Sequence, residues 1–162
     1  MSGPVLRAIE PRDHAAVLAL NDANVPAVSA MGEARLTELL GLADRSDVVD
    51  VDGEVAGFVL TFAPGSTYDS LNYRAFSARY GTDFYYLDRI AIDERFRRRG
   101  LATFVYDEIE AVAHPYGRNT LEVNTEPPNE VSMAFHLGRG YLEVGTRGDD
   151  HAQVALLAKE LG

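Results

Sequence analysis

The chain has 162 residues, of which 46% are hydrophobic, and a formal net charge of -10 at pH 7. The length predicts a single domain over residues 1–162 rather than two of ordinary size. The charge argues against general binding to nucleic acid, and no stretch approaches the ~20 apolar residues that span a bilayer. The absence of cysteine excludes disulfides and thiolate metal sites and fits a cytoplasmic protein, so we expect no metal.

The first third of the chain alternates between strand and helix patterns. Strands are predicted over Val5–Ile9, Val48–Val51 and Val55–Phe62, and helices over Asp13–Ala23 and Glu33–Ala43. Asp52-Gly53, between the second and third strands, is a strong hairpin signal because this pair suits a type I′ turn. The region therefore begins as a mixture of strands and helices.

Residues 63–82 form a polar segment that is unusually long for a connection within a compact domain. A helical turn is predicted from Ser70 to Arg79, and the aromatic side chains are Tyr68, Tyr73, Phe76 and Tyr80. Segments of this length often act as lids or binding loops. We expect a lid that shapes an acceptor pocket; the alternative is a covering segment whose aromatic side chains complete the core.

The second half of the chain continues with strands and helices in turn. Strands are predicted over Phe84–Ile92, Thr120–Asn124, Tyr141–Thr146 and Gln153–Ala158, and helices over Gly100–His114 and Asn129–Leu137. The acidic turn Gly148-Asp149-Asp150 joins the last two strands. The order of elements predicts an α/β fold, a mixed and mostly antiparallel sheet with helices on both faces.

An arginine-rich loop links the strand that ends at Ile92 to the following helix. Arginines at positions 95, 97, 98 and 99 form the only dense basic cluster of an acidic chain. A tight loop before a helix presents unpaired backbone N–H groups and the positive end of the helix dipole. This combination suits a polyanion, most simply a pyrophosphate.

Two sequence motifs, about 30 residues apart, carry a resemblance to a known family. Ile90-Ala91-Ile92 precedes Arg97-Arg98-Arg99-Gly100-Leu101-Ala102, which has the form Arg/Gln-x-x-Gly-x-Gly/Ala, and a second motif runs from Asn129 to Tyr141. The chain resembles the GNAT superfamily of N-acetyltransferases along nearly its whole length. The resemblance implies an acetyl-CoA-dependent N-acetyltransferase that acts on a primary amine of a small molecule or peptide in a ternary complex.

The resemblance also implies which residues hold acetyl-CoA. Backbone N–H groups of the loop would cradle the pyrophosphate, with Gly100 allowing close approach, while the strand would pair with the pantetheine arm. Asn129 would hold that arm or cap its own helix. The residues so implied are Ile90, Ala91, Ile92, Arg97, Arg98, Arg99, Gly100, Leu101, Ala102, Thr103 and Asn129.

One position departs from the family pattern. The second motif often contains a tyrosine that protonates the departing thiolate, and here that position is His136. A protonated histidine, with a pKa near ~6.5, could donate to a thiolate whose conjugate thiol has a pKa near ~8.5. Alternatively, His136 packs at the helix end and Tyr85 or Tyr86 serves as the acid.

Asp88 is the first candidate for the base that deprotonates the amine. Strand alternation predicts that it shares a face with Tyr86, Ile90 and Ile92, and a charge in an apolar strand needs a reason. Alternatively, Asp88 and Arg89 point to opposite faces and are each paired structurally with other elements, and Glu122 or an ordered water is the base. The residues expected to contact the acceptor are Tyr68, Tyr73, Phe76 and Tyr86.

Two other functions compete with acetyl transfer. A catalytically silent CoA-binding sensor would keep the loop without a usable acid or base. A nucleotide phosphotransferase is disfavoured because the loop lacks the Gly-Lys-Ser/Thr end of a P-loop, and the only lysine, Lys159, cannot replace it. The oligomeric state stays open, with a homodimer through the closing strands as one option.

Overall fold

In the computed structural model, residues 3–148 and 153–162 are described, and they form one seven-stranded sheet in the order β1-β2-β3-β4-β5-β7-β6. The strands are β1 Val5–Ala8, β2 Arg45–Val51, β3 Glu54–Phe62, β4 Tyr85–Ile92, β5 Arg118–Glu126, β6 Leu142–Gly148 and β7 Gln153–Glu160. The helices are α1 His14–Ala23, α2 Glu33–Leu42, α3 Leu71–Tyr80, α4 Leu101–Ala113 and α5 Glu130–Gly138. The predicted mixed, mostly antiparallel sheet is confirmed, while Asp149 and Asp150 of the predicted turn lie outside the described residues.

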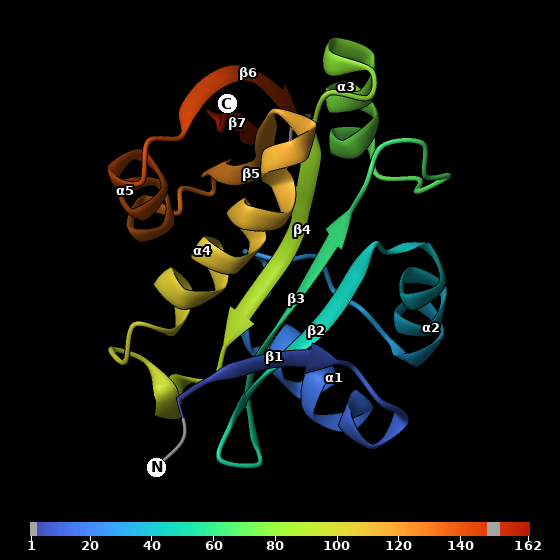
Figure 1. Cartoon of the computed structure of the whole chain (residues 1–162), viewed down its shortest axis with the longest axis vertical. Coiled ribbons are helices and arrows are strands. Elements are labelled where there is room, and N and C mark those ends of the chain that lie inside the picture. Colours follow the sequence, from blue (N-terminus) through green and yellow to red (C-terminus); the bar gives the residue numbers. More distant parts are fainter. Residues whose placement is uncertain (1–2, 149–152) are drawn as a thin grey trace.

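The sheet has a hydrophobic core on each face (Figure 1). Helices α1, α2 and α3 contribute buried side chains such as Val17, Leu36 and Phe76 to one core. Helix α4 contributes Val105 and Ile109 to the other core, where side chains of α5 also pack. Among residues 3–148 and 153–162, no helix is long and apolar enough to cross a membrane.

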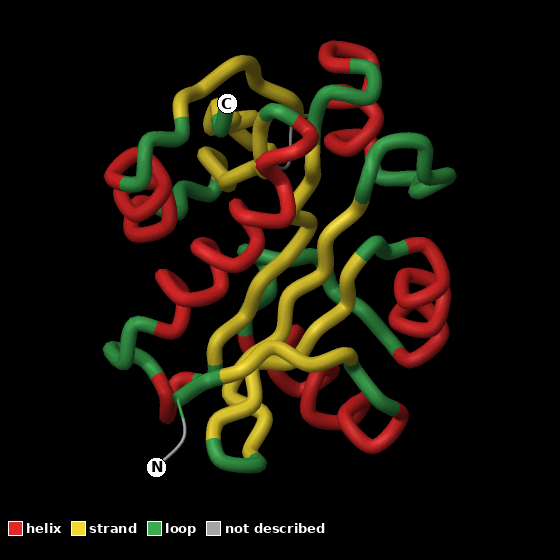
Figure 2. The backbone as a smooth tube through the Cα atoms, viewed as in Figure 1, coloured by secondary structure: helices red, strands yellow, loops and turns green. Residues whose placement is uncertain are grey.

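Strands β4 and β5 run parallel in the middle of the sheet (Figures 1 and 2), and a cavity lies between them. These strands pair only at Tyr85–Asn119 and Tyr86–Thr120. Beyond Tyr86 the two strands diverge, so the edge of β4 that faces β5 has no strand partner. Backbone groups on such an edge stay available to a ligand.

A β-bulge in β4 corrects the predicted alternation. Thr61 of β3 pairs with Leu87 and Leu60 pairs with Arg89, which leaves Asp88 as an extra residue. One extra residue reverses the two-residue alternation of every position after it. Ile90 and Ile92 therefore pack on the α4 side, opposite Tyr86, and the expectation of one shared face with Tyr86 is wrong.

Candidate active site

Three neighbouring cavities share wall residues, two of them at the diverging strands and the third between α1 and the end of β4. The middle cavity has a volume of about 220 Å³ and lies between β4 and β5, bounded by α5. It shares Asp88, Glu122 and other wall residues with a cavity of about 460 Å³ under residues 68–72. It shares Asn24 with a third cavity, of about 530 Å³, that extends to Ile92 and Arg97. Together they connect the arginine-rich loop with the predicted lid.

The arginine-rich loop has the backbone expected of an anion site. Arg98 and Gly100 have positive φ angles of 64° and 72°, and Gly100 precedes α4 without a side-chain cap. A Cβ added to Gly100 would meet no atom within 4 Å, so the space beside it is open. The side chains of Arg97 and Arg98 are exposed and form no ion pair with any residue that the structure describes.

Glu122 of β5 is the carboxylate with the most strongly altered acidity in the cleft. Burial, with the charge of Asp88 as the second cause, raises the pKa of Glu122 to about 7. The Tyr86 hydroxyl donates a hydrogen bond of 2.6 Å to Oε1, and Asn72 of the lid helix donates one of 3.0 Å. Near neutral pH this carboxylate can therefore take up and release a proton.

Asp88 has a different environment on the opposite wall. Its Oδ2 accepts a hydrogen bond of 2.6 Å from Arg89 Nε, in an ion pair whose two side chains are 5% and 6% exposed. Its Oδ1 accepts one of 2.6 Å from the hydroxyl of Tyr68. Both oxygens are thus already occupied by strong donors, one of them cationic.

His136 of α5 is buried and bonded at both ring nitrogens. Nδ1 lies 2.7 Å from the carbonyl oxygen of Ser132, which can only accept, so Nδ1 carries the proton. In the neutral ring Nε2 then accepts from the hydroxyl of Tyr106, 2.6 Å away. Burial is the first cause of a lowered pKa for His136, which favours this neutral form.

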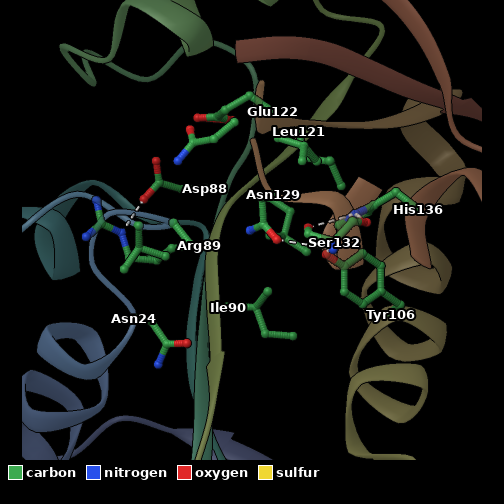
Figure 3. A pocket seen from close by; sticks show the side chains of 15 residues that line it. Asn24, Asp88, Arg89, Ile90, Tyr106, Leu121, Glu122, Asn129, Ser132 and His136 are labelled. Carbon is green, nitrogen blue, oxygen red and sulfur yellow. Dashed lines mark hydrogen bonds and ion pairs between the residues drawn. The ribbon is translucent and has the colours of Figure 1, made fainter. Parts of the chain in front are cut away.

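Figure 3 shows how these groups are divided across the cleft. Asp88, Arg89 and Glu122 lie on one side of β4, and Tyr106, Ser132 and His136 lie on the other. An amine on the first side and a leaving group on the second would each meet a group that can hold a proton. The arrangement can therefore support acyl transfer between two ligands in the gap.

Other predicted residues reach the cleft to different extents. Asn129 accepts from the backbone N–H of Ser132, so the helix cap is confirmed; it also lines the middle cavity, and its contact with the CoA arm stays a prediction. Ile90 lines the middle cavity and Ile92 the third. Ala91 is buried on the α1 side. Loop residues 98–103 line none of the three cavities.

The predicted lid is partly a core element. The helix predicted from Ser70 to Arg79 is confirmed as α3. Tyr68 lines the cavity of about 460 Å³, whereas Tyr73 and Phe76 are buried in the core and line neither that cavity nor the middle one. Tyr86 is fully buried, lines none of the three cavities and donates a hydrogen bond to Glu122.

Two contributions to the site were missed in the sequence. Tyr106 lies in the middle of α4, where its spacing is typical of a core residue, and only the fold brings it to His136. Arg89 was expected only to pair structurally with another element, whereas it forms an ion pair with Asp88 itself and lines two cavities. Tyr85, an alternative acid, donates instead to Asp44, away from the cleft. No group of three or more metal-binding side chains occurs in residues 3–148 and 153–162.

The chain belongs to the GNAT acetyltransferase family, whose model, described as "Acetyltransferase (GNAT) family", matches residues 17–141. Similar solved structures include Ard1 from Thermoplasma volcanium, with a TM-score of 0.76 and 18% identity over 98% of both chains. The ribosomal-protein-S18-alanine N-acetyltransferase from Escherichia coli has a TM-score of 0.69 and 16% identity over 99% of this chain and 95% of that one.

A GNAT-family acetyltransferase from Streptococcus pneumoniae is similar too, with a TM-score of 0.69 and 19% identity over 99% of this chain and 100% of that one. At these identities the likeness to the solved structures shows a shared fold. A search of curated protein sequences finds no match.

Proposed function

We propose that this acetyltransferase moves the acetyl group of acetyl-CoA to a primary amine of a small molecule or peptide, by direct attack in a ternary complex. The observation that carries the proposal is Glu122, a carboxylate with a pKa of about 7 on the wall shared by two adjoining cavities. A general base works best when its pKa lies near the working pH. The family membership supplies the acetyl group as the one transferred.

The arginine-rich loop fits the pyrophosphate of acetyl-CoA. Three features favour a bound polyanion here. There is open space beside Gly100, the side chains of Arg97 and Arg98 pair with no carboxylate among the described residues, and the N–H groups at the start of α4 have no side-chain cap. The cavity that runs from Arg97 past Ile92 leads from this loop to the middle cavity. The pantetheine arm would lie along the unpaired edge of β4. Acetyl-CoA, when bound, supplies the thioester.

Glu122 is the proposed base, in place of Asp88. An amine of the lysine type has a pKa near ~10.4 and reaches the enzyme as an ammonium ion. Glu122 would accept one proton from that nitrogen at a carboxylate oxygen, while Tyr86 and Asn72 hold the carboxylate in place. Asp88, bound to Arg89 and Tyr68, would add negative charge that attracts the ammonium.

Tyr106 is the proposed source of the proton for the leaving sulfur. The hypothesis that His136 is itself the acid does not suit a neutral ring whose only proton is bonded to the Ser132 carbonyl. His136 would instead position the hydroxyl of Tyr106, which shares the wall of the middle cavity and would turn its proton from Nε2 of His136 to the sulfur. Replacement of either residue should then lower turnover more than acetyl-CoA affinity.

The test is release of free CoA thiol from acetyl-CoA in the presence of a panel of amines. We expect saturable thiol release that Glu122→Gln lowers about 10²-fold or more, as removal of a general base does in other enzymes. Glu143→Gln, which alters an exposed carboxylate of β6, is the matched control. Calorimetric binding of acetyl-CoA without thiol release from any amine would contradict the proposal and favour a CoA-binding sensor.

A further inference from the structure

The cavity of about 460 Å³ carries both signs of charge on its wall. Asp88 and Glu122 line this cavity and the middle one, so they lie where the two meet. Arg147 of β6 lines only the larger cavity, and its Nε donates to the side chain of Asn72. Arg35 lines it as well, but its guanidinium pairs with two surface carboxylates. The wall is therefore dipolar, although the chain as a whole is acidic.

Arg89 places a second guanidinium at the same wall. Its side chain is 6% exposed, Nε binds Asp88, and Nη1 binds the Asn21 side chain and the Ser29 carbonyl. The guanidinium also interacts with the hydroxyl of Tyr68, which donates to Asp88. Of the three guanidinium nitrogens, Nη2 alone makes no hydrogen bond to Asp88, Asn21 or Ser29, and it is the one that would bind an anion in the cavities that Arg89 lines.

We propose that the acceptor is a small zwitterion, an amine with a carboxylate on the adjacent carbon, as in a free amino acid. The inference rests on the function proposed above and names its substrate class. The ammonium group would lie at Asp88 and Glu122, and the carboxylate would bind Arg89 Nη2 and the guanidinium of Arg147. A volume of about 460 Å³ is in the range of small-molecule sites.

Other amines match this wall less well. The α-amine of a peptide has an amide next to it, which leaves the donors of Arg89 and Arg147 without an anion. A polyamine would bring a second cation towards the same two arginines. An unmatched charge in a desolvated site costs binding free energy, so the wall selects against both classes.

The experiment compares free amino acids with amines that lack the carboxylate. Rates of thiol release are measured with the standard amino acids, their α-amides and the corresponding decarboxylated amines. At neutral pH a larger fraction of the amide is present as the uncharged amine, because an adjacent carboxylate raises the pKa of the amine in the free acid. A preference for the free acid must therefore come from the protein. A charge-assisted hydrogen bond contributes about 1.5–3 kcal/mol, which corresponds to a preference of tenfold or more in kcat/KM.

Arg147→Gln tests the anion contact directly. We expect it to lower kcat/KM for the best amino acid at least tenfold more than for its amide, while Arg147→Lys keeps part of the preference. Arg74→Gln, on the exposed side of α3, is the matched control. Equal or faster turnover of amides, or an equal loss for acid and amide, would overturn the inference and leave the acetyltransferase function standing.

Absence of thiol release with every amine would instead contradict the proposed function. Calorimetric binding of the same amino acids and amides to the protein then tests the anion site separately. Binding of acids but not amides supports the site, and equal binding or none overturns it.

Discussion

Replacement of Glu122 by glutamine should stabilise the protein relative to the native chain, and this gain in the free energy of unfolding should grow as the pH rises. The carboxyl has a pKa of about 7 in the fold and an ordinary value of 4.5, a difference of about 2.5 units. Each unit corresponds to about 1.36 kcal/mol, so ionisation of Glu122 costs the folded state about 3 kcal/mol. The glutamine side chain would keep an acceptor for the hydroxyl of Tyr86 but would have no charge to bury.

The sign of the pH dependence follows from the direction of that shift. A group whose pKa is raised in the fold contributes stability below its unfolded pKa, and this contribution is lost as the pH rises through the folded value. Relative to the native protein, Glu122→Gln should therefore gain about 2–3 kcal/mol between about pH 5 and about pH 8. For a chain of this size the gain corresponds to roughly 5–10 °C in Tm.

Urea unfolding of the native protein and the variant at both pH values measures this difference. Glu143→Gln, at an exposed position, should show no such dependence on pH. If the free energies of unfolding of Glu122→Gln and the native protein differ by the same amount at both pH values, the reasoning is refuted. The pKa of Glu122 would then not be raised by folding.

Other variants test the remaining parts of the site. Asp88→Asn leaves a buried guanidinium without its counter-ion and should destabilise the fold by about 3–5 kcal/mol in urea unfolding, the opposite sign to Glu122→Gln. His136→Phe and Tyr106→Phe should each lower kcat much more than acetyl-CoA affinity, and unchanged turnover in either would remove that residue from the mechanism. Gly100→Val should abolish calorimetric acetyl-CoA binding and cost about 1–2 kcal/mol in backbone strain. Gly117→Val, with a φ of 91° and equally open space, should show only the strain; equal affinity in both would sink the loop assignment.

The element order was predictable because each element depends on local periodicity. The hairpin at Asp52-Gly53 has the positive φ angles of 52° and 89° that the pair favours, and α3 begins where Ser70 accepts a hydrogen bond from the N–H of Tyr73. The bulge at Asp88 was not predictable, since Leu87, Asp88 and Arg89 contain no glycine and the register is set by pairing with β3. The face of the sheet on which Ile90 and Ile92 lie was therefore predicted wrongly.

The chemistry of the site depends on contacts that are distant in sequence. The altered pKa of Glu122 arises from burial between segments that include Asn72, 50 residues away. Tyr106 and His136 are separated by 30 residues on different helices. Motifs indicated that these regions matter, but only the fold shows which atoms can exchange a proton.

The most direct measurement is the pH dependence of kcat/KM for thiol release from acetyl-CoA, for the native protein and Glu122→Gln. The account predicts that the native rate rises with pH through a pKa of about 7, because the ionised carboxylate is the base, and that the residual rate of the variant lacks this step. An identical pH profile in both proteins, or a variant as fast as the native protein, would contradict the assignment of Glu122 as the base.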